Sequence, residues 1–262
     1  MRASLLLLSL LAFGCATSTT STIDLAKAEV IDLTYAYDAK TLYWPSSEGT
    51  FELKQLAYGQ TESGYFYSSF AFCTPEHGGT HLDAPIHFAA GKRTVDQVPV
   101  RQLIAPVVVI DVASKAAADV DYTLTVDDVR QWEARHGAIE RGTIVLLHTG
   151  WGARWGDRLR YFGDDTPKAT DKLHFPSYGT EAAQLLVTER QVGALGVDTA
   201  SIDYGKSHDF MVHRIANEAN VPGLENVANV DRLPARGAWL VALPVKIGGG
   251  SGGPVRIVAL VP

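Results

Sequence analysis

The sequence predicts one mixed α/β domain. The chain has 262 residues, of which 46% are apolar and 20% are charged, so it can bury a full core and suits a single large domain. Short apolar runs typical of buried strands alternate with segments that have helical spacing. From about Val30 onward no internal repeat, low-complexity insert or linker interrupts this pattern.

The first 22 residues differ in character from the rest. Arg2 gives a positive start, residues 5–13 form an apolar run, and Cys15 follows soon after. The run is too short to span a bilayer, so it predicts a secretory signal. It resembles a bacterial lipoprotein signal in which Cys15 becomes the lipid anchor and a polar tether follows, whereas an ordinary signal peptide cut nearby is the alternative. We therefore expect an exported protein, periplasmic or membrane-anchored, with residues 1–22 as signal and tether and residues 27–262 as the domain.

The cysteine count bears on disulfide bonds, and the distribution of charge bears on the class of partner. Cys73 is the single cysteine outside the signal, so no intrachain disulfide is possible, and we expect Cys73 to be a small buried residue. The formal net charge is −6 and the basic residues are scattered. A nucleic-acid partner requires a concentrated positive face, so this class of partner is excluded.

Strands are predicted at both ends and in the centre of the domain. Segments rich in β-branched and aromatic residues, with turn residues between them, indicate the first strands. Short apolar runs indicate buried strands further along. The predicted strands cover residues 30–37, 51–59, 65–74, 105–112, 143–149, 193–199, 238–245 and 254–262.

Three helices are predicted between these strands. In the first, Thr125 can cap the N-terminus, Asp128 completes a capping box, and Gly137 ends the helix. The second covers residues 179–193 and the third residues 208–220.

The glycine-rich stretch 246–253 matches two well-known motifs by coincidence. It satisfies G-x-S-x-G and G-x-G-x-x-G, but both motifs require a helix after the glycines. Pro254 and a predicted strand follow instead. We therefore interpret the stretch as a hairpin turn.

The segment "EHGGTHLDAPIHF" (76–88) is the strongest candidate site. Its glycines and proline argue against a helix, so we expect residues 77–87 to be extended or gently looped. In an extended chain alternate side chains share one face. His77, His81, Asp83 and His87 are in phase, so we expect them to converge, with Gly79 leaving room for an ion. Imidazole and carboxylate donors together favour Zn²⁺ or Mn²⁺ over Ca²⁺. A single satisfied core histidine does not explain four such residues in phase.

Further ligands must come from elsewhere in the chain. His213 lies on the third predicted helix, and Glu225 follows a Pro-Gly turn that can bring it back toward the same place. His148, His208 and Asp209 are weaker candidates, since each one taken alone fits a surface or capping role.

The stretch "HGGTHLDAPIH" resembles the H-x-G-T-H-x-D-x-P-x-H motif of the putative cyclase family of metal-dependent hydrolases, which includes bacterial kynurenine formamidase and isatin hydrolase. "YWP" (43–45), "LLHTGW", "LGVDTASIDYG" and "GLEN" support the resemblance. It implies an α/β swivelling β/β/α cyclase-like domain with a distorted β-barrel core and peripheral helices. It also implies a homodimer or higher homo-oligomer.

The resemblance assigns roles to the candidate residues. His77, His81 and Asp83 match the family's metal ligands, and residues matching His213 and Glu225 complete the site in its two-metal members. One or two divalent ions, Zn or Mn, are therefore expected. His87 matches the family's proton acceptor and donor, and Trp44 matches the aromatic residue that lines the substrate pocket.

The expected activity is hydrolysis of a C–N bond in a small formamide or cyclic amide by metal-activated water. Two alternatives remain: a lactone or ester hydrolase that uses the same residues, and a binding lipoprotein that holds the metal without catalysis. The chain departs from the formamidase pattern in three places. It has an export signal, it has "GGTH" where formamidases often have an alanine before the second histidine, and its residues 156–179 resemble an insertion able to reshape the pocket mouth.

Overall fold

The structure is a computed structural model that describes residues 23–262. The predicted signal peptide, the tether and the Cys15 anchor lie outside these residues. Within the described part of the chain, no helix is both long and apolar enough to cross a membrane.

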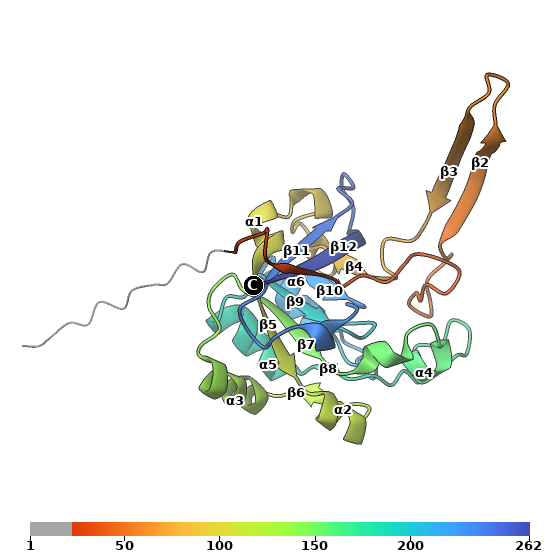
Figure 1. Cartoon of the computed structure of the whole chain (residues 1–262). Helices are drawn as coiled ribbons and strands as arrows, with labels where there is room; N and C mark the ends of the chain where they lie inside the picture. The colour runs from red at the N-terminus through yellow and green to blue at the C-terminus, as the bar shows by residue number, and fades with distance from the viewer. Residues whose placement is uncertain (1–22) are drawn as a thin grey trace, which may run out of the picture.

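A closed barrel of seven strands forms the centre of the molecule (Figure 1). The strands follow one another in the order β12, β11, β5, β7, β9, β10 and β4, and pairing of β12 with β4 closes the ring. The short strand β1 pairs with β12 outside this ring. The expectation of an α/β domain with a β-barrel core is therefore confirmed. The bounds are β1 Glu29–Asp32, β4 His81–Asp83, β5 Ile104–Asp111, β7 Ile144–His148, β9 Ala194–Val197, β10 Gly223–Glu225, β11 Trp239–Pro244 and β12 Gly252–Val261.

The parallel strands β5, β7 and β9 separate two apolar cores. Along β5, Val107 and Val109 belong to the core inside the barrel, whereas Val108 and Ile110 belong to the core beneath the helices. Strands buried on both faces lose the alternation of polar and apolar residues. This explains why the sequence shows continuous apolar runs here.

Short helices cover the outer faces of these strands (Figure 1). Thr125 and Asp128 form the predicted capping box at the start of α3, and Gly137 ends that helix. The second predicted helix continues as a π-helical turn over Leu185–Glu189. The helices are α1 Val100–Leu103, α2 Ala113–Ala118, α3 Val126–His136, α4 Arg158–Phe162, α5 Thr180–Gln184 and α6 Met211–Glu218, and a small sheet joins β6 Thr123–Leu124 to β8 Ser177–Tyr178.

Helix α6 starts three residues later than predicted, for a tertiary reason. Phe210, the residue before the helix, has a left-handed backbone with φ of 50°. The side chain of Asp203 then accepts the backbone N–H groups of Val212 and His213. A carboxylate from a preceding loop therefore caps the helix, and no local sequence signal marks this start.

The hairpin of β2 (Glu52–Gln60) and β3 (Phe66–Cys73) projects away from the barrel (Figure 1). Most of its side chains are exposed, and Cys73 at its end is exposed as well. The expectation that Cys73 is buried is therefore wrong. A small apolar side chain is buried only if its strand packs on a core, and these strands pair only with each other.

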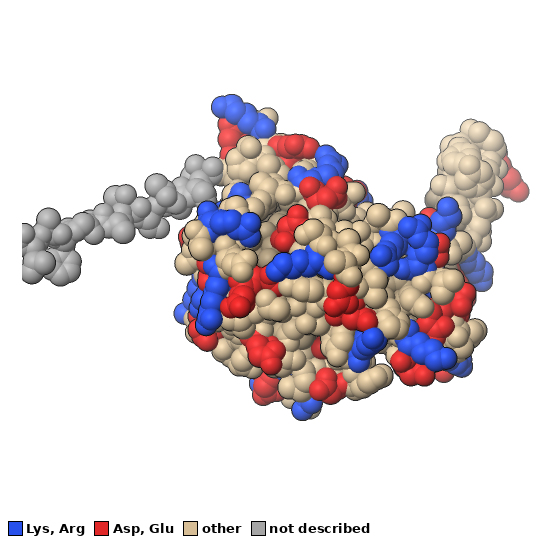
Figure 2. Space-filling view, turned by 90° about the horizontal axis from the view of Figure 1, so that it is seen from below, with Lys and Arg blue, Asp and Glu red and all other residues tan. Residues whose placement is uncertain are grey.

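Acidic and basic side chains are interspersed on the face shown in Figure 2, without a large patch of one sign. The hairpin in that view carries few charges.

Candidate metal centre and active site

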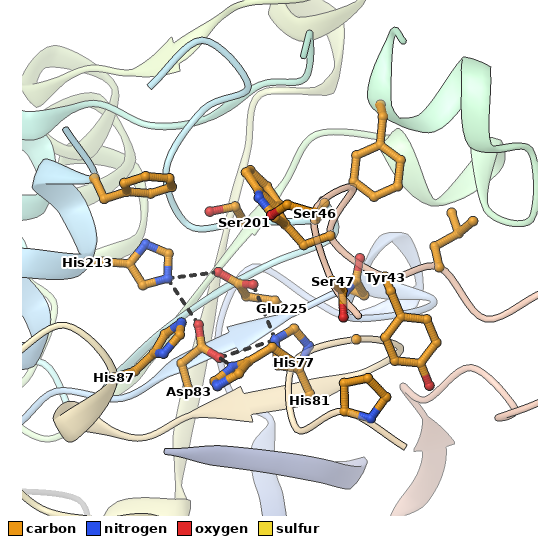
Figure 3. A pocket seen from close by; sticks show the side chains of 18 of the residues that line it. Tyr43, Ser46, Ser47, His77, His81, Asp83, His87, Ser201, His213 and Glu225 are labelled. Carbon is orange, nitrogen blue, oxygen red and sulfur yellow. Dashed lines mark hydrogen bonds and ion pairs between the residues drawn. The ribbon is translucent and has the colours of Figure 1, made fainter. Parts of the chain in front are cut away.

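A cavity of about 310 Å³ opens beside β4 and is lined by all the residues to which the family resemblance assigns a role. Figure 3 shows the histidines and carboxylates among them. The motif supplies four of these residues, α6 supplies His213, and β10 supplies Glu225. The seven predicted residues that line it are Trp44, His77, His81, Asp83, His87, His213 and Glu225. The structure thus brings them together, while their individual roles stay predictions. The three weaker candidates, His148, His208 and Asp209, are not among the residues that line this cavity.

The carboxylate of Asp83 lies at the centre of the cluster. One oxygen, Oδ1, lies 2.6 Å from His77 Nδ1 and 3.2 Å from His81 Nε2. The other oxygen, Oδ2, lies 3.0 Å from His213 Nε2. The two oxygens of Asp83 therefore face different imidazoles: Oδ1 faces His77 and His81, and Oδ2 faces His213.

Glu225 repeats this arrangement from the neighbouring strand. Its Oε2 lies 3.4 Å from His81 Nε2, and its Oε1 lies 3.2 Å from His213 Nε2. Because β10 pairs with β4 in antiparallel register, with Glu225 opposite His81, the barrel itself sets this distance. Both carboxylates can therefore contact two positions, one near His81 and one near His213.

Neighbouring groups fix the orientation of the two most buried histidines. His213 Nδ1 lies 2.7 Å from Asp203 Oδ2, which leaves Nε2 pointing toward the cluster. His81 Nδ1 donates to the carbonyl oxygen of Gly79 at 3.0 Å, and its Nε2 also faces the cluster. Partners of this kind set the tautomer of metal-binding histidines and keep their ligand nitrogens in place.

The pKa values show how strongly these groups interact. Burial lowers the pKa of His81, but the carboxylates of Asp83 and Glu225 outweigh burial and raise this pKa to about 9. Burial, together with the charge of Asp83, raises the pKa of Glu225. The pKa of Asp83 is held well below its ordinary value because three histidine charges and the hydrogen bond from His213 outweigh its burial. Two buried carboxylates that face buried imidazoles form a donor set that fits a divalent cation.

His87 lies at the edge of this cluster, stacked on His77 with ring centroids 3.8 Å apart. Burial and the nearby histidines lower its pKa to about 4 even though Asp83 acts in the opposite sense. Among the described residues, none forms a hydrogen bond with a ring nitrogen of His87. Its position also brings a ring nitrogen near Asp83 and His77, so by distance alone it can act as a ligand.

The motif is extended over a short part of its length and looped elsewhere, within the expectation of an extended or gently looped segment, and its last residues make a tighter turn. Only residues 81–83 form a strand, and residues 85–87 form a 3₁₀ turn that brings His87 back over the cluster. Gly79 has a positive φ of 60°, and a Cβ atom there would lie 2.5 Å from Cζ of Tyr37. The expectation that Gly79 leaves room for an ion is therefore wrong, because the space beside it is filled by Tyr37.

Aromatic side chains form the opposite wall of the cavity. Trp44 makes edge-to-face contacts with Phe162, Phe175 and Phe210, with ring centroids between 6.2 and 6.5 Å apart. Phe162 belongs to the insertion-like segment 156–179, which therefore contributes to the cavity as expected. The wall is apolar and suits a flat substrate.

Four supporting residues were missed at the level of the sequence. Asp203 caps α6 and contacts His213, while Asn226 donates to the carbonyl oxygen of Gly79. Ser251 and Glu76 lie behind His77. Glu76 lies in the segment 76–88, and Asp203 and Asn226 lie in the stretches "LGVDTASIDYG" and "GLEN" that support the family resemblance, so these stretches were the available signal. Ser251 lies in the glycine-rich turn, where no metal-binding pattern marks it.

Comparison with known proteins agrees with this geometry. Residues 31–204 match the family described as putative cyclase. The isatin hydrolase of Roseibium aggregatum is 40% identical over 195 residues, which cover 71% of this chain and 72% of that protein. The kynurenine formamidase of Salinibacter ruber is 26% identical over 233 residues, covering 87% and 96% of the two chains.

A solved structure extends the likeness to the fold. Isatin hydrolase A from Ralstonia solanacearum is 36% identical and superimposes with a TM-score of 0.81, covering 94% of this chain and 100% of that chain. With the motif, the barrel and the cluster in agreement, the chain belongs to the putative cyclase family.

Proposed function

We propose that this enzyme, a metal-dependent hydrolase of the cyclase family, cleaves the C–N bond of a small formamide or cyclic amide. The observation that carries the proposal is the position of His87, whose ring lies beside a buried His/Asp/Glu cluster at the foot of an aromatic-lined cavity. The relatives support the same class: by their names, isatin hydrolases act on isatin, a cyclic amide, and kynurenine formamidases act on a formamide.

The metal, His87 and Trp44 have different roles in the proposed reaction. A divalent ion bound in this cluster supplies polarisation of the substrate carbonyl and lowers the pKa of water at the site. His87, neutral near pH 7 because of its lowered pKa, accepts the proton of the attacking water and returns it to the leaving nitrogen. Trp44 packs against the flat face of the substrate.

The metal is Zn²⁺ or Mn²⁺ in this proposal, since mixed imidazole and carboxylate donors suit both ions. The two oxygens of Asp83 and of Glu225 face different nitrogens, one on His81 and one on His213, so the cluster has enough donors that these residues would hold a second ion. Metal analysis of the purified protein distinguishes one ion per chain from two.

The experiment that tests the activity is a substrate screen with matched chelator controls. Purified protein loaded with Zn²⁺ or Mn²⁺ is assayed against aryl formamides, lactams and lactones, with and without chelator. We expect chelator-sensitive hydrolysis of a formamide or lactam. Hydrolysis of lactones alone would assign an ester hydrolase, and stoichiometric metal without any turnover would assign a binding protein; either result overturns the proposal.

The hairpin supports a homodimer or higher homo-oligomer. Eight large apolar side chains on it are between 44% and 65% exposed, which is more than an isolated surface normally carries. An unpacked two-stranded hairpin is also marginally stable alone, and symmetric self-association is the commonest way to cover such a surface. Light scattering should show an oligomer that the double change Phe70→Glu and Phe72→Glu dissociates, while Leu159→Glu on α4 leaves it intact. A monomeric wild-type protein would contradict this.

Export and a lipid anchor through Cys15 complete the proposal, supported by the apolar run of residues 5–13 before Gly14 and Cys15. Labelling with a fatty-acid analogue in the producing bacterium should mark the wild-type protein and not Cys15→Ala. Equal labelling of both would reject the anchor at this residue.

A further inference from the structure

The glycine-rich turn between β11 and β12 lies directly behind His77. Ser251 and His77 are separated by 174 residues, yet Ser251 Oγ lies 2.9 Å from His77 Nε2. The other ring nitrogen, Nδ1, faces Asp83 at 2.6 Å. The ring therefore has one nitrogen toward the metal cluster and one toward Ser251.

Ser251 is itself held by Glu76. Its hydroxyl donates to Glu76 Oε2 at 2.6 Å, and its backbone N–H donates to the same oxygen at 3.0 Å. A serine hydroxyl has one proton to donate, and here that proton is used in the hydrogen bond to the Glu76 carboxylate. The Oγ atom therefore presents lone pairs to His77, and Nε2 must be the nitrogen that carries a proton. With Nε2 donating to Ser251, Nδ1 is the nitrogen that would give its lone pair to a metal in place of its present contact with Asp83.

Barrel closure fixes the position of this pair. The carbonyl oxygen of Ser251 accepts the backbone N–H of Ala84 at 2.8 Å, and the next residue, Gly252, pairs with Asp83 across β12 and β4. Ser251 is thus tied to the strand that carries two of the predicted ligands.

The glycines around Ser251 permit this approach. A Cβ atom at Gly252 would lie 2.7 Å from Cε1 of His77, and one at Gly250 would lie 2.6 Å from Oε1 of Glu76. Real Cβ atoms do not approach so closely, so a side chain at Gly252 would collide with the His77 ring and also with the carbonyl oxygen of Leu82, 2.6 Å away. Gly250 and Gly252 therefore allow the turn to lie close to Glu76 and His77.

We propose that Ser251 and Glu76 are positioning residues that hold His77 with Nε2 protonated and Nδ1 directed to the metal. The pair also fixes the plane of the ring on which His87 stacks. The inference rests on the proposed metal site and deepens it, because it says which nitrogen of His77 binds and what keeps it there.

The test measures metal binding and not turnover. Metal-free protein is titrated with Zn²⁺ in competition with a chromophoric chelator. Ser251→Ala should raise the Zn²⁺ dissociation constant about 10-fold or more, as loss of a partner behind a metal-binding histidine does. Glu76→Ala, which frees the serine proton to turn toward Nε2, should also weaken binding. Ser68→Ala on the hairpin is the matched control and should bind as the wild type does.

A spectroscopic readout separates positioning from general damage. In ¹⁵N spectra of the Zn²⁺-loaded protein, the ring signal of His77 should show a protonated Nε2 that exchanges slowly with solvent, and Ser251→Ala should make this exchange fast. Affinities of both variants within twofold of the wild type, or a protonated Nδ1 in the wild type, would overturn the inference. A wild-type protein that binds no Zn²⁺ would instead reject the proposed metal site.

Discussion

The rings of His77 and His87 stack with their planes only 16° apart and their centroids 3.8 Å apart. A predicted metal ligand and the predicted proton carrier are thus in direct contact, although ten residues separate them. The 3₁₀ turn over residues 85–87 produces this contact.

Replacing His87 by alanine should lower kcat about 10²- to 10⁴-fold, which is the usual contribution of a positioned acid–base group. Metal content should stay at the wild-type value because His77, His81 and Asp83 are untouched. Steady-state kinetics and metal analysis of the same preparation check both halves. Loss of the metal in His87→Ala would identify His87 as a ligand, and full activity would remove it from the mechanism.

Asp83→Ala should abolish both metal binding and turnover, since Asp83 contacts histidines on both sides of the cluster.

Asp203→Asn gives a graded comparison. It weakens the contact that orients His213 and also the cap of α6, to which the same carboxylate contributes, so we expect a metal dissociation constant raised about 10- to 100-fold. Chelator-competition titrations measure both variants. Equal affinities for Asp203→Asn and the wild type would show that His213 needs no such partner.

Trp44→Ala should raise KM for an aryl formamide about 2- to 10-fold, matching the interaction energy of one aromatic contact. An alkyl formamide serves as the control substrate, because it has no ring to pack against Trp44, and its KM should change little. If both substrates lose affinity equally, Trp44 supports the shape of the wall and does not contact the substrate.

Gly79→Ala should lower the free energy of unfolding by about 2–5 kcal/mol. The positive φ costs a non-glycine residue about 1–2 kcal/mol, and the overlap with Tyr37 adds about 1–3 kcal/mol of overpacking. Gly91→Ala is a matched control, because Gly91 has a φ of 75° but open space around its Cβ position. Denaturant unfolding of the two variants should therefore differ, and equal losses would rule out the Tyr37 contact as the cause.

Asp128 should make the free energy of unfolding depend on pH in the acidic range. Burial raises its pKa, but contacts with Lys115, Tyr122 and Thr125 outweigh burial and lower the pKa to about 2. The ordinary value is about 3.9. A lowered pKa means that the stabilisation is fully present above about pH 4 and is lost as the pH falls through about 2.

Asp128→Asn should accordingly cost about 1–2 kcal/mol at pH 7, through loss of charged hydrogen bonds and of half the capping box. The difference from the wild type should disappear near pH 2. Asp127→Asn, at the exposed neighbouring position, is the control and should cost little. A difference that stays constant from pH 7 to pH 2 would show that the carboxylate charge is not responsible.

Local signals predicted much of the fold. The capping box and terminal glycine of α3, the buried runs of β5 and β7, and the hairpin turn before β12 all appear as expected. These features depend on neighbours within one turn or one strand, where residue type alone limits the backbone. The start of α6 and the exposure of Cys73 were not predictable in this way, because they depend on a distant carboxylate and on a hairpin that packs against no core.

The sequence by itself determined the donor chemistry of the site: the histidines and carboxylates, and the family motif that spaces them. Only the tertiary structure decided which atoms face one another. The pairing of β12 and β10 with β4 places Ser251 behind His77 and Glu225 opposite His81. Barrel closure brings together segments that are more than a hundred residues apart in the sequence. The spacing of residues within one segment therefore cannot predict these contacts.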